Sequence, residues 1–159
     1  MGIVKVGIAE GNVISTMNNI VKPSSFTIPY TSSEIHGITT KIANERGENI
    51  STVLQNFNVL LQQADYVVAH NIEFDENVIA AEFVKNEMHN GLEKKRKICT
   101  MKSTTGFCKV GELHEYKWPK LSELYYKIFN EEFEETHNAR LDVEATVRCF
   151  WELKKKGIL

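Results

Sequence analysis

The middle of the sequence places an aspartate at the start of a predicted helix, on the side expected to face the core. Asp75 follows the strand-like run YVVA at 66–69, and Ile79 and Phe83 occupy the i+4 and i+8 positions on the same helical face. The helix dipole favours a carboxylate in a first turn. It does not explain the inward direction, because a carboxylate beside apolar groups is costly unless it is hydrogen-bonded, paired or bound to a metal ion.

The last predicted helix repeats this arrangement with a second aspartate. From Asp142, positions i+4, i+7 and i+11 are Thr146, Cys149 and Leu153, and His137 precedes the aspartate by five residues. Each aspartate alone is explained equally well as a helix cap or as a ligand. The two carboxylates together with the histidine favour a functional site.

Length and composition define the class of protein that holds these residues. A chain of 159 residues is about one domain, and 42% apolar with 25% charged residues is typical of a globular protein. No apolar run approaches the ~20 residues of a membrane span, and the start shows no signal-peptide pattern. Three irregularly placed cysteines suit a reducing cytoplasm. With a net charge of -2, a site for a polyanion would have to be built locally.

The hydrophobic pattern predicts an α/β domain with a mixed sheet flanked by helices, because a hairpin comes first and strands then alternate with helices. The strands are expected at 3–9, 13–21, 66–70 and 98–101, and the helices at 41–46, 51–64, 71–88, 121–129 and 138–156. The segment 102–117 is predicted to be loop. Trp118, beside Pro119, is interpreted as a core anchor for the helix that follows.

Two motifs resemble a known family. HNxxFD at 70–75 and HxAxxD at 137–142 resemble the second and third motifs of the DEDDh 3′–5′ exonucleases, an RNase H-like family that includes the proofreading subunits of bacterial DNA polymerase III. The resemblance continues through SEIHGIT at 33–39, KWPKLSELY at 117–125 and DVEAT at 142–146, and so covers nearly the whole chain.

The resemblance implies hydrolysis of a DNA or RNA phosphodiester at the 3′ end with two divalent cations. It implies that Asp75 and Asp142 are metal ligands, that the ions are Mg²⁺ or Mn²⁺, and that His137 is the general base. His36 and Phe74 are candidates for the pocket of the terminal nucleotide. The alternatives are a turn or cap role for His36 and core packing for Phe74. No particular polymerase partner is indicated.

The chain departs from the family in its first motif. There, two further carboxylates come as Asp-x-Glu on the first strand, which is central in the sheet, and the predicted strands of this chain carry no Asp-x-Glu. We therefore expect residues 1–159 to be a single exonuclease-like domain, N-terminally incomplete relative to the family and impaired in hydrolysis. The alternative is a non-catalytic pseudo-exonuclease that binds nucleic acid or a protein; accidental motif matches are a third hypothesis. The strands beside the gap are expected to share one sheet and to pair directly or between two copies. The alternative is a marginally stable domain with an open, solvated cleft between them.

Overall fold

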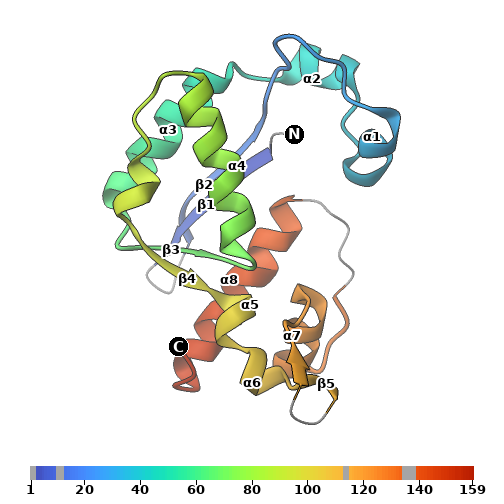
Figure 1. Ribbon diagram of the computed structural model, residues 1–159, viewed down its shortest axis with the longest axis vertical. Helices are drawn as coiled ribbons and strands as arrows, with labels where there is room; N and C mark the ends of the chain where they lie inside the picture. Colours follow the sequence, from blue (N-terminus) through green and yellow to red (C-terminus); the bar gives the residue numbers. More distant parts are fainter. Residues whose placement is uncertain (1–2, 10–12, 113–114, 134–138) are drawn as a thin grey trace.

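The structure, a computed structural model, describes residues 3–9, 13–112, 115–133 and 139–159 (Figure 1). Its strands form three pairs. The antiparallel hairpin consists of β1 (Ile3–Ala9) and β2 (Val13–Ile20), the parallel pair of β3 (Tyr66–Ala69) and β4 (Arg96–Cys99), and the small antiparallel pair of β5 (Val110–Glu112) and β6 (Glu115–Lys117).

The helices account for most of the described chain. They are α1 (Tyr30–His36), α2 (Thr40–Arg46), α3 (Ile50–Gln63), α4 (Ile72–Lys85), the 3₁₀ helix η1 (Gly91–Lys94), α5 (Thr100–Ser103), α6 (Thr105–Cys108), α7 (Leu121–Phe129) and α8 (Ala139–Lys155). Within the described ranges, no helix combines the length and the apolar character needed to cross a membrane.

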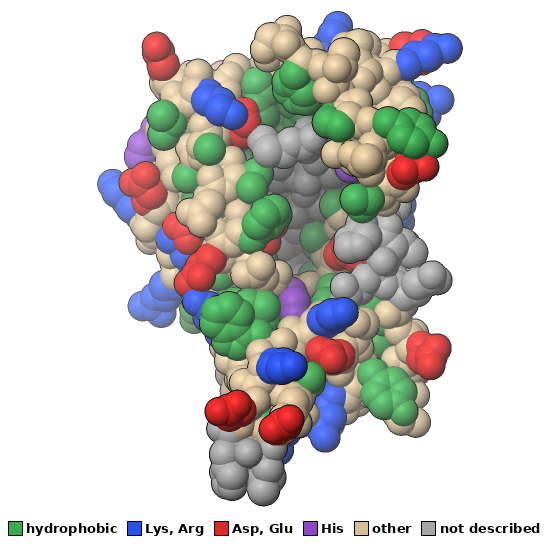
Figure 2. All heavy atoms as spheres, turned by 45° about the vertical axis from the view of Figure 1, so that its right-hand side comes forward, with side chains coloured by type: hydrophobic (Ala, Val, Ile, Leu, Met, Phe, Trp, Pro, Cys, Tyr) green, Lys and Arg blue, Asp and Glu red, His purple; other side chains and the backbone are tan. Residues whose placement is uncertain are grey.

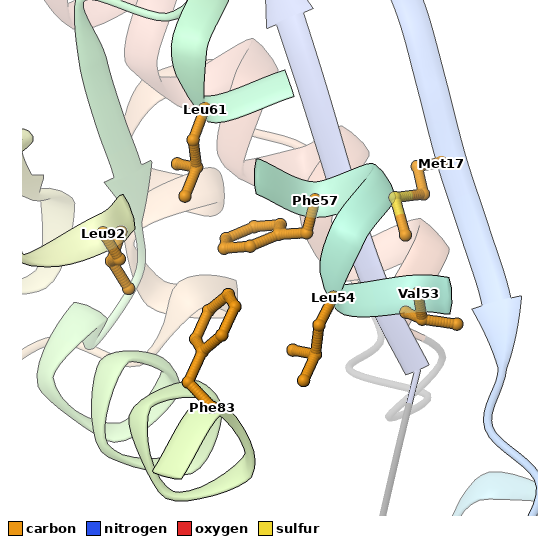
Figure 3. Close-up of a cluster of buried hydrophobic side chains, with 7 residues drawn as sticks. All are labelled: Met17, Val53, Leu54, Phe57, Leu61, Phe83 and Leu92. Atoms are coloured by element: carbon orange, nitrogen blue, oxygen red, sulfur yellow. The ribbon is translucent and has the colours of Figure 1, made fainter. Parts of the chain in front are cut away.

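One hydrophobic cluster joins α3, α4, β2 and η1 (Figure 3). The apolar positions of α3 recur at helical spacing and are buried, so this helix turns one face to the core. The rings of Phe57 and Phe83 point toward each other, with centroids 6.4 Å apart. The buried members of the cluster are Met17, Val53, Leu54, Phe57, Leu61, Phe83 and Leu92. This cluster fixes α4, which carries the first candidate residue.

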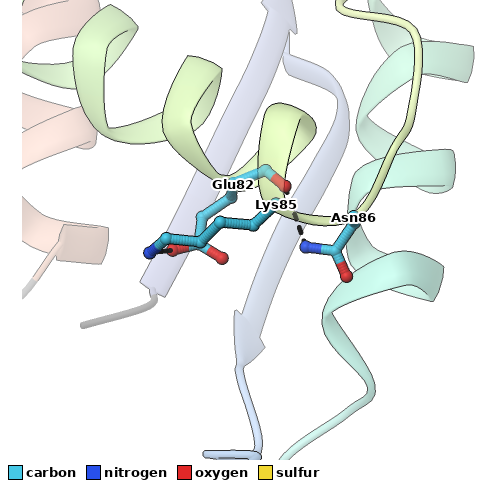
Figure 4. A network of polar contacts seen from close by, with 3 residues as sticks. All are labelled: Glu82, Lys85 and Asn86. Carbon is cyan, nitrogen blue, oxygen red and sulfur yellow. Dashed lines mark hydrogen bonds and ion pairs between the residues drawn. The ribbon is translucent and has the colours of Figure 1, made fainter.

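Polar contacts end α4 at Lys85, before the predicted residue 88 (Figure 4). Nδ2 of Asn86 donates to the carbonyl oxygen of Glu82 at 2.8 Å, which satisfies one of the free carbonyls at the helix end. Nζ of Lys85 lies 3.0 Å from Oε1 of Glu82. The chain then turns through Glu87, whose φ is 53°.

A second hydrophobic cluster joins α7 to α8. Its buried members are Leu121, Leu124 and Tyr125 from α7, and Ala145, Cys149 and Leu153 from α8. Burial raises the pKa of the Cys149 thiol to about 12, as expected for a thiol that serves packing. This cluster fixes the helix that carries the second candidate residue.

The single mixed sheet predicted from the sequence is divided. Among the described strands, β1 pairs only with β2, and β3 pairs only with β4. The expectation that β1 and β3 would share one sheet and pair directly is therefore wrong for this chain. Helix α8 lies against both β1 and β3 instead. Among the described strands, none pairs with both β1 and β3.

Several element boundaries also differ from the predictions. Helix α1 was not predicted, and it buries none of its residues, so it has no apolar periodicity to reveal it. The strand predicted at 98–101 is β4 at Arg96–Cys99, and α5 begins at Thr100, inside the predicted strand. The rest of α5, α6 and the pair β5–β6 occupy a segment that was predicted to be loop. Helix α3 begins at Ile50 rather than at Ser51, because Asn49 is its N-cap and accepts from the backbone N–H of Ser51 at 2.8 Å. The turn expected at 10–12 lies outside the described residues.

Candidate functional site

A sharp turn leads from β3 into α4. Asn71 sits at the start of the helix with a φ of 70°, a left-handed conformation that asparagine tolerates better than most residues. The turn places Glu73 and Asp75 in the first turn of α4, directly after the strand. The strand predicted before the HNxxFD motif and the helix predicted to begin within it are therefore both present.

Asp75 has a perturbed acidity. Desolvation by the surrounding protein raises the pKa of its carboxyl from 3.8 to about 6. The residue nevertheless remains exposed, so solvent screens its charge and limits the energetic cost of the shift. The i+4 and i+8 positions face the core, as predicted: Ile79 packs against the first cluster and Phe83 is fully buried. Asp75 thus lies at the margin of the core.

His70 ties the end of β3 to two other segments. Its Nε2 lies 2.9 Å from the carbonyl oxygen of Pro119, and its Nδ1 lies 3.0 Å from Oγ1 of Thr100. A carbonyl oxygen can only accept, so Nε2 carries the proton of this contact and Nδ1 accepts from the threonine when the ring is neutral. This geometry supports the structural role that a strand-end histidine suggests.

Asp142 lies in the first turn of α8 with its side chain directed inward. The residue is half-buried, and its Oδ1 atom is buried. The positions predicted to share its face, Thr146, Cys149 and Leu153, are all buried. Oγ1 of Thr146 donates to the backbone carbonyl of Asp142 at 2.8 Å, a bond within the first turns of the helix. The prediction of an inward-facing acid is confirmed here.

The helices that carry the two aspartates both contact the same strand. Helix α4 follows β3 and contacts it, and α8 also lies against β3 (Figure 1). The face that comes forward in Figure 2 is hollowed in its middle, with acidic, basic and histidine side chains around the hollow. The convergence of Asp75 and Asp142 on one cleft stays a prediction.

The other predicted site residues have different outcomes. His36 ends α1, and its Nδ1 accepts from the backbone N–H of Ile38 at 3.1 Å, which is the turn contact named as the alternative to nucleotide binding. Phe74 is 65% exposed, so the core-packing alternative is wrong for this residue. His137, the predicted general base, lies outside the described residues.

The described residues do not make a complete metal centre. Across them, no cluster of three or more His, Cys, Asp or Glu residues could hold a metal ion. The spacing Asp-x-Glu does occur once, as Asp142-Val143-Glu144. Residues i and i+2 of a helix point in different directions, unlike those of a strand. Glu144 accordingly is exposed and pairs with Arg140 at 3.0 Å.

Two side chains near the start of α4 were not singled out from the sequence as site residues. Lys102 forms an ion pair with Glu73, and its Nζ lies 5.2 Å from the ring centroid of Trp118. Trp118 is 60% exposed, so its interpretation as a core anchor is wrong. The neighbouring Pro119 takes the buried position instead. The sequence feature that could have pointed to this surface is Trp118 with Lys117 and Lys120 on either side of it.

Comparison with known proteins identifies the family. Residues 1–150 match the model of the exonuclease family RNase T. The chain therefore belongs to this exonuclease family. No curated protein sequence gives a significant match.

Solved structures of exonuclease I share the fold. One is 20% identical, with a TM-score of 0.71 over 91% of this chain and 34% of that chain. E. coli exonuclease I in complex with a 5cy-dA13 oligonucleotide is 19% identical, with a TM-score of 0.71 and the same coverage of 91% and 34%. The zinc-bound E. coli exonuclease I–ssDNA complex has 19% identity, a TM-score of 0.70 and coverage of 91% and 34%. The chain spans about a third of the length of these proteins, and the similarity confirms the RNase H-like α/β fold.

Proposed function

We propose that residues 1–159 form a single exonuclease domain of the DEDDh type that binds the 3′ end of DNA or RNA. The observation that carries the proposal is the family match over residues 1–150. It is supported by the position of the two motif aspartates, each in the first turn of a helix that contacts β3. We expect the domain to act in the cytoplasm without a membrane attachment.

The proposed roles follow the motifs. Asp75 and Asp142 are the metal-binding carboxylates, with Mg²⁺ or Mn²⁺ as the ions, and His137 is the general base. His36 and Phe74 contact the terminal nucleotide. The raised pKa of Asp75 supports this assignment, because perturbed carboxyls concentrate at functional sites.

The described residues do not fit a two-metal centre by themselves, since they lack a cluster of three ligands. We therefore assign no hydrolytic step to metal ions, and we expect hydrolysis by this chain to be impaired. The same observation favours a second candidate function, a pseudo-exonuclease that binds nucleic acid or a protein without cleaving. A pseudo-exonuclease that binds nucleic acid would differ from the exonuclease only in turnover.

A nuclease assay separates these functions. A 5′-labelled single-stranded oligonucleotide is incubated with the protein and Mn²⁺, and the lengths of the products are read on a gel. The exonuclease proposal predicts slow shortening from the 3′ end that is lost in Asp142→Asn and Asp75→Asn and unchanged in Glu93→Gln, a control on the exposed part of η1. Binding without shortening would support the pseudo-exonuclease that binds nucleic acid, and the absence of both would contradict this function and the exonuclease.

A further inference from the structure

We propose that Trp118 stacks on a base of single-stranded nucleic acid, with Lys102, Lys117 and Lys120 contacting the phosphates beside it. The inference rests on the proposed function for its ligand class. It extends the binding surface away from the two aspartates, and it names the residue that selects single strands over duplexes.

Trp118 is an exposed aromatic residue next to a buried proline. It is 60% exposed, whereas the adjacent Pro119 is fully buried. A single exposed aromatic residue needs no special explanation. Trp118, however, is held in place, because the Nζ atom of Lys102 lies 5.2 Å from its ring centroid, within the range of a cation–π contact. The exposed part of the indole leaves area for a second planar group.

Two contacts fix this surface beside the start of α4. The carbonyl oxygen of Pro119 accepts from Nε2 of His70 at 2.9 Å, so the backbone next to Trp118 is tied to the end of β3. Lys102 forms its ion pair with Glu73, which lies two residues before Asp75. A strand whose 3′ end reaches Asp75 would therefore pass close to the indole.

The charge around Trp118 suits a phosphate backbone. Lys117 and Lys120 flank it in the sequence, and both are exposed. Basic, acidic and hydrophobic side chains lie next to one another on the lower part of the face in Figure 2, at the height of α5, α6 and β5 in Figure 1. The ion pair between Lys102 and Glu73 is also exposed, so it contributes little to stability. A phosphate can therefore replace Glu73 as the partner of Lys102.

This combination points to single strands. Aromatic side chains interleaved with cations bind single-stranded nucleic acid by stacking, and they do so without strong sequence preference because every base has a π-face. In a duplex the bases are already stacked on each other, so the indole would find no free face. The local cations also explain how a chain with a net charge of -2 can bind a polyanion.

Tryptophan fluorescence tests the contact directly. The chain has two tryptophans, and Trp151→Phe leaves Trp118 as the single reporter. In EDTA, which prevents hydrolysis, we expect oligo(dT) and oligo(U) to quench this emission, and duplex DNA to quench it much less. Equal quenching by duplex, or none by either single strand, would overturn the proposal.

Affinity measurements on variants complete the test. By fluorescence anisotropy, Trp118→Ala should weaken binding of oligo(dT) about 5- to 150-fold, the usual range for one lost stacked base, and Trp118→Phe should retain most of it. Tyr66→Ala, at an exposed aromatic residue at the start of β3, is the matched control and should bind like the parent. Lys120→Ala should reduce the slope of log K against log salt by about 0.7. Unchanged affinity of Trp118→Ala would refute the stacking role.

The outcome of the Trp118→Ala affinity test does not depend on whether the protein hydrolyses nucleic acid. If Trp118→Ala binds like the parent while Asp142→Asn abolishes shortening of the oligonucleotide, the stacking inference fails and the exonuclease function stands. If Trp118→Ala loses affinity while no variant shortens the oligonucleotide, the stacking inference stands and the pseudo-exonuclease is supported.

Discussion

Replacing Asp75 by asparagine should stabilise the protein at neutral pH. The pKa of Asp75 is about 6 in the folded chain against an ordinary 3.8, and its cause is desolvation, which disfavours the charged form. The difference is 6 − 3.8, or about 2, which corresponds to at most about 3 kcal/mol at ~1.4 kcal/mol per pH unit. Because the residue is exposed, solvent screening reduces this to roughly 1 kcal/mol. The neutral amide of an asparagine at this position would have no charge to desolvate.

The sign of the pH dependence follows from the same pKa values. The folded state holds the proton of Asp75 more strongly than the unfolded state, so stability is lost as the pH rises from 3.8 through about 6. Above that range both states are ionised, and the folded state bears the full cost. The advantage of Asp75→Asn should therefore be present at pH 7 and shrink as the pH falls toward 4.

Thermal unfolding in EDTA at several pH values measures this effect. A gain of roughly 1 kcal/mol raises the Tm by about 2–4 °C for a domain of this size. Asp65→Asn, in the exposed turn before β3, is the matched control and should leave the Tm unchanged. A lower Tm for Asp75→Asn at pH 7, or a gain that does not depend on pH, would refute the desolvation argument.

Four further predictions concern the stability, the thiols and the association of the chain. His70→Ala should lower the free energy of unfolding in urea by about 1–3 kcal/mol, since it leaves the fully buried Thr100 without its ring partner; no change would show that the bridge is not structural. Leu153→Ala should cost about 2–5 kcal/mol in the same assay, whereas Val84→Ala, at a residue that is 78% exposed, should change little; equal effects would contradict the assignment of the second cluster. The thiol of Cys149 should not react with an alkylating reagent until the protein unfolds, and mass spectrometry of the native protein would detect any contrary labelling. Light scattering should show self-association at high concentration, because β1 and β3 each have an edge that is not paired with another described strand; a strict monomer at all concentrations would contradict this.

The elements with a strong apolar periodicity could be predicted from the sequence. Helices α3, α7 and α8 bury one face each, and that face was visible in the spacing of residues such as Phe57, Leu124 and Leu153. Helix α1 was not visible, because none of its residues is buried. The division of the sheet was not visible either, because strand pairing depends on which strands meet in space rather than on the pattern of any one strand.

The candidate site was predictable in part for similar reasons. The inward direction of Asp142 follows from helical spacing alone, and the structure confirms it. The exposure of Trp118 could not be predicted, because it depends on the bridge from His70 to the Pro119 carbonyl and on the position of Lys102. The pKa of Asp75 likewise depends on protein that surrounds it in space.

The central claim is that Asp75 and Asp142 belong to one metal-binding site. Mn²⁺ broadens the NMR signals of nearby backbone amides even when it binds weakly, so a titration of the ¹⁵N-labelled protein reports where the ion spends its time. We predict that the amides in the first turns of α4 and α8 broaden together, and that Asp142→Asn reduces the broadening in both turns. Broadening confined to one of the two helices, or distributed over exposed acidic residues elsewhere, would contradict the claim.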